Sequence, residues 1–395
     1  MKHPTNRRAF IKYSALGLAG TSLSSSLLSC EDSSSQPEPA ITMLPLYIGT
    51  YTNKESEGIY RALFNPASGE LTDFRLAAPA SNPSFLAIHP QKTHLYSVNE
   101  VTDYEGAPSG AVSAFSMQQG GELEHVNSQA TQGGAPCYIS MDAHGRWVLT
   151  ANYGGGNVAL FPVLENGQLS EASSLIQHEG SSVHPRRQQG PHAHCIVLDK
   201  SDRYAYAADL GIDKVMIYQL DQEQGQLIPN NPPFVEMAPG AGPRHFAFHP
   251  DGVHAFAINE LDSTITAFGF DETTGALNPI STASTLPSDF QGTNSCADIH
   301  IHPSGRHVYG SNRGHDSIAV MEFDAPSGTL GLVATEPTQG ETPRNFCLDP
   351  TGQYLLVANQ QTDTIVSFSI DAETGLLSST GHMLNAPTPV CLKFV

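Results

Sequence analysis

The chain has 395 residues, of which 39% are hydrophobic and only 15% are charged. This composition is too apolar for a disordered polymer, and the length allows two or three ordinary domains or one large all-β domain. Acidic residues outnumber basic ones 39 to 19, and four of the basic ones precede residue 30; the rest of the chain therefore has 15 basic against 39 acidic residues, a net charge of −24. Such a chain repels polyanions, which excludes nucleic acid as a partner.

Residues 1–29 have the layout of an export signal, with a basic start, a short apolar run and a small-residue exit. The Arg7-Arg8 pair resembles a twin-arginine signal. Leu27-Leu28-Ser29-Cys30 resembles a bacterial lipobox, in which Cys30 would be lipidated; the alternative is an ordinary thiol near a plain cleavage site. We therefore expect export to the bacterial cell envelope, membrane attachment only through a lipid on Cys30, and a polar linker over residues 30–40.

Five further cysteines follow, an odd number without any Cys-x-x-Cys pair. This pattern indicates neither a disulfide framework nor a zinc site. Because each lies in an apolar segment, we expect buried free thiols. They are Cys137, Cys195, Cys296, Cys347 and Cys391.

One pattern recurs after residue 40. It is a short apolar run that usually begins with proline and ends at a polar turn, as in Pro243-Arg-His-Phe-Ala-Phe-His-Pro250. Six complete copies and a truncated seventh occur about 46–55 residues apart, the size of one four-stranded propeller blade. The copies begin at Pro83, Pro136, Pro191, Pro243, Cys296, Pro343 and Pro389.

Each copy contains further strands, such as Ala255–Asn259 and Thr264–Phe268, and no helix-period segment of useful length appears. The N-terminal segments Leu46–Thr52, Gly58–Phe64 and Glu70–Leu76 supply strands two to four of a last blade, whose first strand lies at the C-terminus. The sequence therefore predicts an all-β, seven-bladed β-propeller over residues 41–395. Each blade has four antiparallel strands, and one blade is closed by both chain ends.

Strand direction brings particular residues together at one end of the central channel, which we call the mouth. The first strand of each blade starts there and the second strand ends there. The turn histidines His89, His249 and His302 lie at the opposite face and are interpreted as blade architecture. The mouth positions differ between copies and are predicted to collect His192, His194, Arg244, Arg344, Arg313, Glu100 and Glu260. Converging charges of both signs indicate a site, the alternative being surface ion pairs around a plain channel.

Five segments of the chain carry a resemblance to a known family: Tyr47–Thr52, Gly190-Pro-His-Ala-His-Cys195, Ala207–Val215, Gly242–Gly252 and Asn259-Glu260. They resemble the seven-bladed lactonase family, which includes propeller-type 6-phosphogluconolactonases and the carboxy-cis,cis-muconate lactonizing enzyme. The resemblance covers nearly all of residues 45–395, although the export signal departs from the cytosolic location of 6-phosphogluconolactone. It implies a site formed by His192 or His194 with Arg244, Glu260 and Arg344.

We therefore expect hydrolysis of a small, anionic sugar-acid lactone by direct attack of water, because neither a nucleophilic serine elbow nor a Cys–His pair is evident. Glu260, His194 or His192 would take the proton of the water, and Arg244 would stabilise the developing oxyanion. The predicted substrate-binding residues are Arg344, Arg313 and Glu100.

No cofactor or metal is expected, although His192 and His194, two residues apart on a strand, offer an alternative metal site with Glu260. Two other functions stay open on the sequence. One is a non-catalytic, ligand-binding propeller of the cell envelope, and the other is a muconate-type cycloisomerase, which is a lyase.

Overall fold

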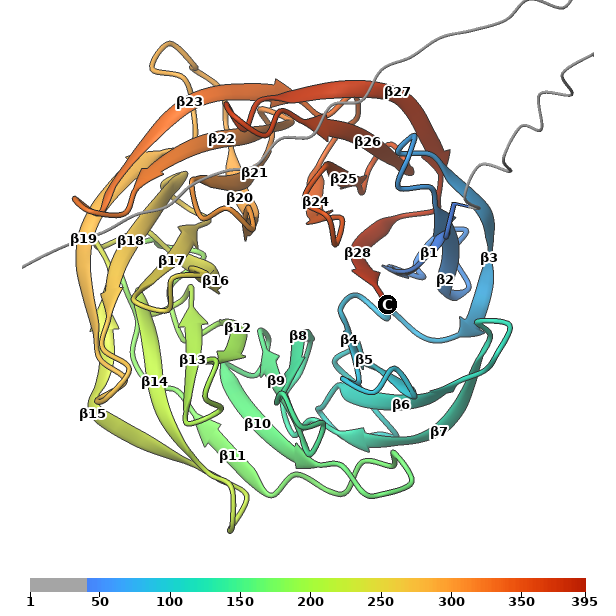
Figure 1. The fold of residues 1–395 in the computed structure, drawn as a ribbon. Helices are drawn as coiled ribbons and strands as arrows, with labels where there is room; N and C mark the ends of the chain where they lie inside the picture. The colour runs from blue at the N-terminus through green and yellow to red at the C-terminus, as the bar shows by residue number, and fades with distance from the viewer. Residues whose placement is uncertain (1–40) are drawn as a thin grey trace, which may run out of the picture. The chain divides into compact units, whose positions relative to one another are not determined.

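The computed structural model describes residues 41–395, which form seven four-stranded antiparallel sheets arranged as blades around a central channel (Figure 1). This confirms the predicted seven-bladed β-propeller with four strands per blade. Within this range no helix is present that could cross a membrane. The predicted export signal, Cys30 and the linker fall on residues 1–40 and lie outside the described residues.

Six blades each use four consecutive strands of the chain, which run in order from the channel outward. Their bounds are β4 (Leu86–Ile88), β5 (His94–Asn99), β6 (Ala111–Met117), β7 (Leu123–Ala130); β8 (Pro136–Met141), β9 (Trp147–Asn152), β10 (Asn157–Pro162), β11 (Ser174–Gln177); β12 (Ala193–Leu198), β13 (Tyr204–Asp209), β14 (Lys214–Asp221), β15 (Gln226–Glu236); β16 (Pro243–Phe248), β17 (His254–Asn259), β18 (Thr264–Phe270), β19 (Leu277–Ser284); β20 (Ser295–Ile301), β21 (His307–Arg313), β22 (Ser317–Asp324), β23 (Thr329–Pro337); and β24 (Pro343–Leu348), β25 (Tyr354–Asn359), β26 (Thr364–Ile370), β27 (Leu377–Asn385).

The remaining blade combines both ends of the chain, as predicted. From the channel outward it consists of β28 (Pro389–Phe394), β1 (Leu44–Thr50), β2 (Gly58–Phe64) and β3 (Leu71–Pro79). In Figure 1 the red β28 lies beside the blue β1, and the register pairs Ile48 with Leu392. Leu392 is only 1% exposed, so the last strand closes the ring with a buried apolar side chain as well as with backbone hydrogen bonds.

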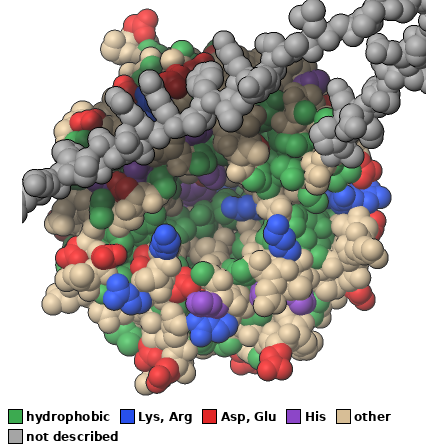
Figure 2. Space-filling model, viewed as in Figure 1, with side chains coloured by type: hydrophobic (Ala, Val, Ile, Leu, Met, Phe, Trp, Pro, Cys, Tyr) green, Lys and Arg blue, Asp and Glu red, His purple; other side chains and the backbone are tan. Residues whose placement is uncertain are grey.

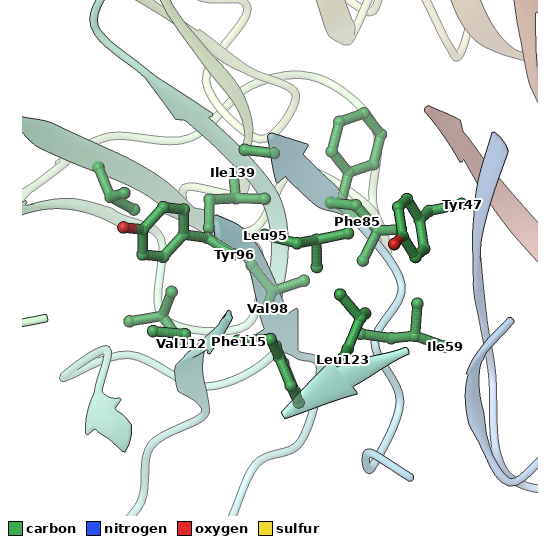
Figure 3. Close-up of a cluster of buried hydrophobic side chains, with 14 of the residues drawn as sticks. Tyr47, Ile59, Phe85, Leu95, Tyr96, Val98, Val112, Phe115, Leu123 and Ile139 are labelled. Carbon is green, nitrogen blue, oxygen red and sulfur yellow. The ribbon is translucent and has the colours of Figure 1, made fainter. Parts of the chain in front are cut away.

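The core lies between neighbouring blades. A middle strand such as β25 is packed on both faces and is continuously apolar and buried from Leu355 to Ala358, whereas the outer strand β27 alternates between half-buried and exposed residues from Thr380 onward. Figure 3 shows one such core, in which Tyr47 from the closing blade and Ile139 from β8 lie on either side of side chains from the blade between them.

The turn at His249 on the face opposite the mouth shows why its residues recur. The Nδ1 atom of His249 accepts a hydrogen bond from the backbone N–H of Asp251 at 3.2 Å, and its Nε2 donates to the carbonyl oxygen of Gly305 in the next blade at 2.7 Å. Gly252 has a φ of 76°, a conformation that favours glycine. The turn histidines are therefore structural, as predicted.

Candidate active site

Four of the innermost strands carry a β-bulge just after their first residue. The pairing of β12 with β13, of β16 with β17 and of β24 with β25 skips His194, Arg244 and Arg344. In β8 the pairing skips Cys137 in the same way. A bulged residue is left out of the ladder and its side chain is re-aimed. The bulges thus place at the channel mouth the residues that differ between copies of the repeat.

A cavity of about 340 Å³ opens at this mouth. Bulge residues and residues that follow the second strand of a blade supply most of its lining. Of the seven residues predicted to meet there, His194, Arg344, Arg313, Glu100 and Glu260 line the cavity. The full lining is Tyr51, Glu100, Cys137, Tyr153, Arg187, His194, Glu260, Ser295, Arg313 and Arg344.

Glu260 stands among three guanidinium groups. Its Oε2 lies 3.0 Å from Nε of Arg244 and 2.9 Å from Arg313, and its Oε1 lies 2.6 Å from Arg187. Burial by itself raises the pKa of the Glu260 carboxyl, but the three cations outweigh it and lower this pKa to about 2. Both oxygens are therefore occupied, and the carboxylate holds the arginines in place.

Arg244 lies behind the cavity rather than in it, which corrects its predicted place at the mouth. It is 1% exposed, and besides Glu260 its Nη1 donates to the carbonyl oxygen of Ala297 at 2.5 Å and to Nε2 of His245 at 3.0 Å. The physical reason is that protein acceptors on neighbouring strands take up these donors. His245 in turn donates from Nδ1 to Asp298 at 2.7 Å, which continues the buried polar network.

His192 is placed beside the cavity. Its ring stacks on Tyr153 with the centroids 4.4 Å apart, and its Nδ1 lies 2.9 Å from the Tyr153 carbonyl oxygen. A carbonyl oxygen only accepts, so Nδ1 carries the hydrogen of this bond.

His194 lines the cavity and contacts a thiol that the sequence analysis did not pair with it: its Nδ1 lies 3.5 Å from Sγ of Cys137. Burial and the charge of Arg244 lower the pKa of His194 well below its usual value, so the ring is neutral at pH 7. Burial also raises the pKa of the Cys137 thiol, which stays protonated. The pair is therefore no thiolate nucleophile, and all five cysteines are the buried free thiols that were predicted.

A second carboxylate, Glu100, lies in the same cavity without a cationic partner. The Tyr51 hydroxyl lies 3.0 Å and 2.9 Å from its two oxygens, and Ser84 Oγ lies 2.5 Å from Oε2. The Arg344 guanidinium lies over the Tyr51 ring at 5.4 Å from its centroid. Within residues 41–395 no Lys or Arg forms an ion pair with Glu100, and Arg344 makes no hydrogen bond to a protein atom.

Sequence reasoning missed Arg187. It lies between β11 and β12, where no repeat position predicts it, and its side chain, 37% exposed, reaches both the Tyr153 hydroxyl at 3.1 Å and Glu260. Gln188 fixes the segment by donating to the carbonyl oxygen of Leu210 at 2.8 Å. The only indication of Arg187 in the sequence is that it belongs to a pair of consecutive arginines in a chain rich in acidic residues.

The alternative metal site of His192, His194 and Glu260 is not supported by the geometry. Among the described residues, the one group of three metal-capable side chains with ligand atoms within 4.8 Å of one another is His249, Asp251 and His254. That group belongs to the structural turn on the opposite face.

A family model described as a lactonase with a seven-bladed β-propeller matches residues 45–394. Among curated proteins, a 6-phosphogluconolactonase of Bacillus subtilis is 39% identical over 350 residues, which cover 88% of this chain and 97% of that protein. A 6-phosphogluconolactonase of Formosa agariphila is 34% identical and covers 84% of this chain and 94% of its own length.

Among solved structures, the periplasmic gluconolactonase of Pseudomonas aeruginosa superimposes with a TM-score of 0.84 at 33% identity. The match covers 90% of this chain and 99% of that protein.

Proposed function

The chain belongs to the lactonase family of seven-bladed β-propellers, and from this premise we propose that it hydrolyses an anionic sugar-acid lactone in the mouth cavity. The observation that carries the anionic character is the Arg344 guanidinium, whose donors have no protein acceptor in the described part of the chain. A planar guanidinium binds a carboxylate or a phosphate through two parallel hydrogen bonds.

The charge of the cavity supports the same substrate. Three arginines line the cavity and a fourth, Arg244, lies behind it, so the cations outnumber the two carboxylates of Glu100 and Glu260. The three lining arginines are Arg187, Arg313 and Arg344. On the face drawn in Figure 2, acidic side chains lie mostly around the rim of the propeller. Because charges more than about 8–10 Å away are screened at physiological salt, a ligand in the cavity experiences the local arginines rather than the acidic surface.

Hydrolysis of a lactone needs a stabilised oxyanion and a proton acceptor for water. As water attacks the ester carbonyl carbon, negative charge develops on the carbonyl oxygen, and donors fixed in advance stabilise it. We assign the oxyanion to Arg313, which lines the cavity and whose Nη1 makes no hydrogen bond to a protein atom within residues 41–395. Glu260 is unsuited to accept the proton, because three arginines occupy it and lower its pKa to about 2.

The experiment is an assay of the purified protein on matched lactones, gluconolactone and 6-phosphogluconolactone, with a muconate as the lyase substrate. We expect hydrolysis, with kcat/KM higher for the phosphorylated lactone. The variant Arg344→Gln should raise KM for that lactone at least about tenfold, since a charged hydrogen bond contributes about 1.5–3 kcal/mol. Arg306→Gln, a change at an exposed arginine away from the cavity, is the matched control.

Other outcomes favour the two alternatives. Binding of lactone without turnover would favour the ligand-binding propeller. Lactonization of the muconate would favour the cycloisomerase.

Export is part of the proposal. The basic and lipobox-like segments of residues 1–30 support it, as does the similarity to a gluconolactonase that is periplasmic in its own organism. An exported enzyme meets lactones outside the cytosol, so the panel includes the unphosphorylated lactone.

A further inference from the structure

The two carboxylates of the mouth cavity differ in their direct contacts. Glu260 contacts three arginines at 2.6–3.0 Å, whereas Glu100 contacts only two hydroxyl groups. The oxygens of a carboxylate that binds several guanidinium groups are taken up by those contacts, whereas a carboxylate that accepts hydrogen bonds only from hydroxyl groups can still accept one from water. The environments thus separate a fixed structural anion from a carboxylate that can take part in proton transfer.

We propose that Glu100 is the general base of lactone hydrolysis and that Tyr51 and Ser84 are its positioning residues. This inference rests on the proposed function and assigns to Glu100 a step that the sequence analysis predicted for Glu260 or a histidine. It also moves Glu100 from substrate binding to catalysis.

The geometry leaves Glu100 one oxygen for water. The single hydrogen of the Tyr51 hydroxyl is shared between the two oxygens, with the hydroxyl oxygen 2.9 Å from Oε2 and 3.0 Å from Oε1, and Oε2 also accepts a hydrogen bond from Ser84 at 2.5 Å. Burial raises the pKa of the Tyr51 hydroxyl, so Tyr51 is a permanent donor. A carboxylate oxygen has two lone pairs, and Oε1 therefore keeps one that can bind a water in the cavity.

The backbone around Glu100 is held from the neighbouring loop. Its N–H donates to the Asn82 carbonyl oxygen at 3.0 Å, and the Asn82 side chain accepts from the Thr52 N–H at 2.8 Å. Thr52 follows Tyr51 directly in the chain, so one loop network fixes both the base and its donor. A general base needs this kind of positioning more than it needs a large shift in basicity.

Arg344 lies on the same side of the cavity, over the ring of Tyr51. A lactone whose anionic substituent binds Arg344 would therefore lie next to a water bound to Glu100 Oε1. Arg313, which also lines the cavity, is then left for the developing oxyanion.

The reaction balances without a further reactant. Water loses a proton to Glu100 while its oxygen forms a bond to the carbonyl carbon, and the carbonyl π pair moves to oxygen. The pair then returns, the ring C–O bond breaks, and the leaving ring oxygen takes the proton from the Glu100 carboxyl. The product is the open hydroxy acid, which releases one proton to solvent at pH 7.

The test compares two Glu→Gln variants on a lactone that the parent cleaves. Glu100→Gln should lower kcat by at least about a hundredfold with little change in KM, because the shape is kept and the base is lost. Formate should partly restore kcat in Glu100→Ala, since it can enter the vacated space as an external base. Glu260→Gln should instead raise KM and lower stability while the acidic limb of the pH–rate profile stays in place. Glu322→Gln, at an exposed glutamate of β22, is the matched control.

Tyr51→Phe gives a second readout that a merely structural role would not move. Loss of this donor should lower kcat and leave KM nearly unchanged, because the substrate contacts remain and only the placement of the base is disturbed. A kcat of Glu100→Gln within about threefold of the parent value would overturn the assignment of Glu100 as the base but would leave the proposed lactonase function standing. A parent that cleaves no lactone would overturn the proposed function, and the role of Glu100 with it.

Discussion

Nε of Arg244 lies 3.0 Å from Oε2 of Glu260, and both residues are buried, at 1% and 4% exposure. Arg244 is the second residue of β16 and Glu260 directly follows β17, so the two strands of one hairpin meet at this ion pair. The pair also receives Arg187 and Arg313, which makes Glu260 the anion that neutralises a buried cluster of cations. Removal of the anion would leave the buried guanidinium group of Arg244 without its anionic partner.

Glu260→Gln should therefore destabilise the fold as well as disturb the cavity. Breaking a buried ion pair on one side costs about 3–5 kcal/mol, and an amide cannot balance the charge of the guanidinium groups. We expect the free energy of unfolding at pH 7, measured by chemical denaturation, to fall by about 3 kcal/mol.

The control for this prediction is Glu322→Gln, which makes the same change at an exposed position and should shift the free energy of unfolding by less than about 0.5 kcal/mol. Equal stabilities of Glu260→Gln and the parent would show that the cluster does not need its anion.

The fold could be predicted because its information is periodic. Seven copies of one pattern gave the number of blades, and the unpaired strand at Pro389 required a partner at the N-terminus. Strand direction then placed five of the seven mouth residues around the cavity, since the ends of antiparallel strands are fixed by topology alone.

The rest of the site could not be predicted, because it depends on side-chain contacts and loop paths. Arg187 comes from an irregular segment, and Arg244 turns away from the cavity because acceptors of Ala297 and His245 lie beside it. Cys137 and His194 lie in neighbouring blades, so no spacing within a single repeat indicates their contact.

Leu392→Ala tests the closure of the ring by the C-terminal strand. Leu392 lies in β28 at 1% exposure and pairs with Ile48, so truncation leaves a cavity at the junction of the two chain ends. We expect a loss of about 2–5 kcal/mol in the free energy of unfolding and a lower Tm. Leu376→Ala, at a leucine that is 39% exposed, is the matched control and should change the Tm little. A Leu392→Ala protein with the Tm of the parent would mean that the ring closes without this contact.

Cell fractionation tests the proposed export route. Cys30→Ala should release the protein from the membrane fraction, because the lipid would be lost while the export signal stays. Arg7→Lys together with Arg8→Lys should leave the protein in the cytoplasm, since the twin-arginine pathway requires both guanidinium groups. Unchanged membrane association of the Cys30→Ala protein would contradict lipidation at Cys30.

The buried His245 should make stability depend on pH in a defined window. Burial and the charge of Arg244 lower the pKa of His245 from 6.5 to about 4, so the unfolded chain binds this proton more tightly than the native protein. The contribution to stability is therefore complete above pH 6.5 and is lost as the pH falls from 6.5 toward 4, by on the order of 3 kcal/mol in total.

His245→Asn removes the titration while its amide can still donate to Asp298. Denaturation curves between pH 4 and 6.5 should show a slope of the free energy of unfolding against pH that is smaller by up to about 1.4 kcal/mol per pH unit, the effect of one proton. Because Arg244 Nη1 donates to His245 Nε2, the native ring takes up a proton only if that hydrogen bond breaks, so acid should loosen the wall behind Glu260 before it protonates Glu260 itself. His144→Asn, at an exposed histidine, should leave the slope as in the parent. An unchanged slope in His245→Asn would assign the acid sensitivity to other groups, with His194 the first to examine by the same substitution.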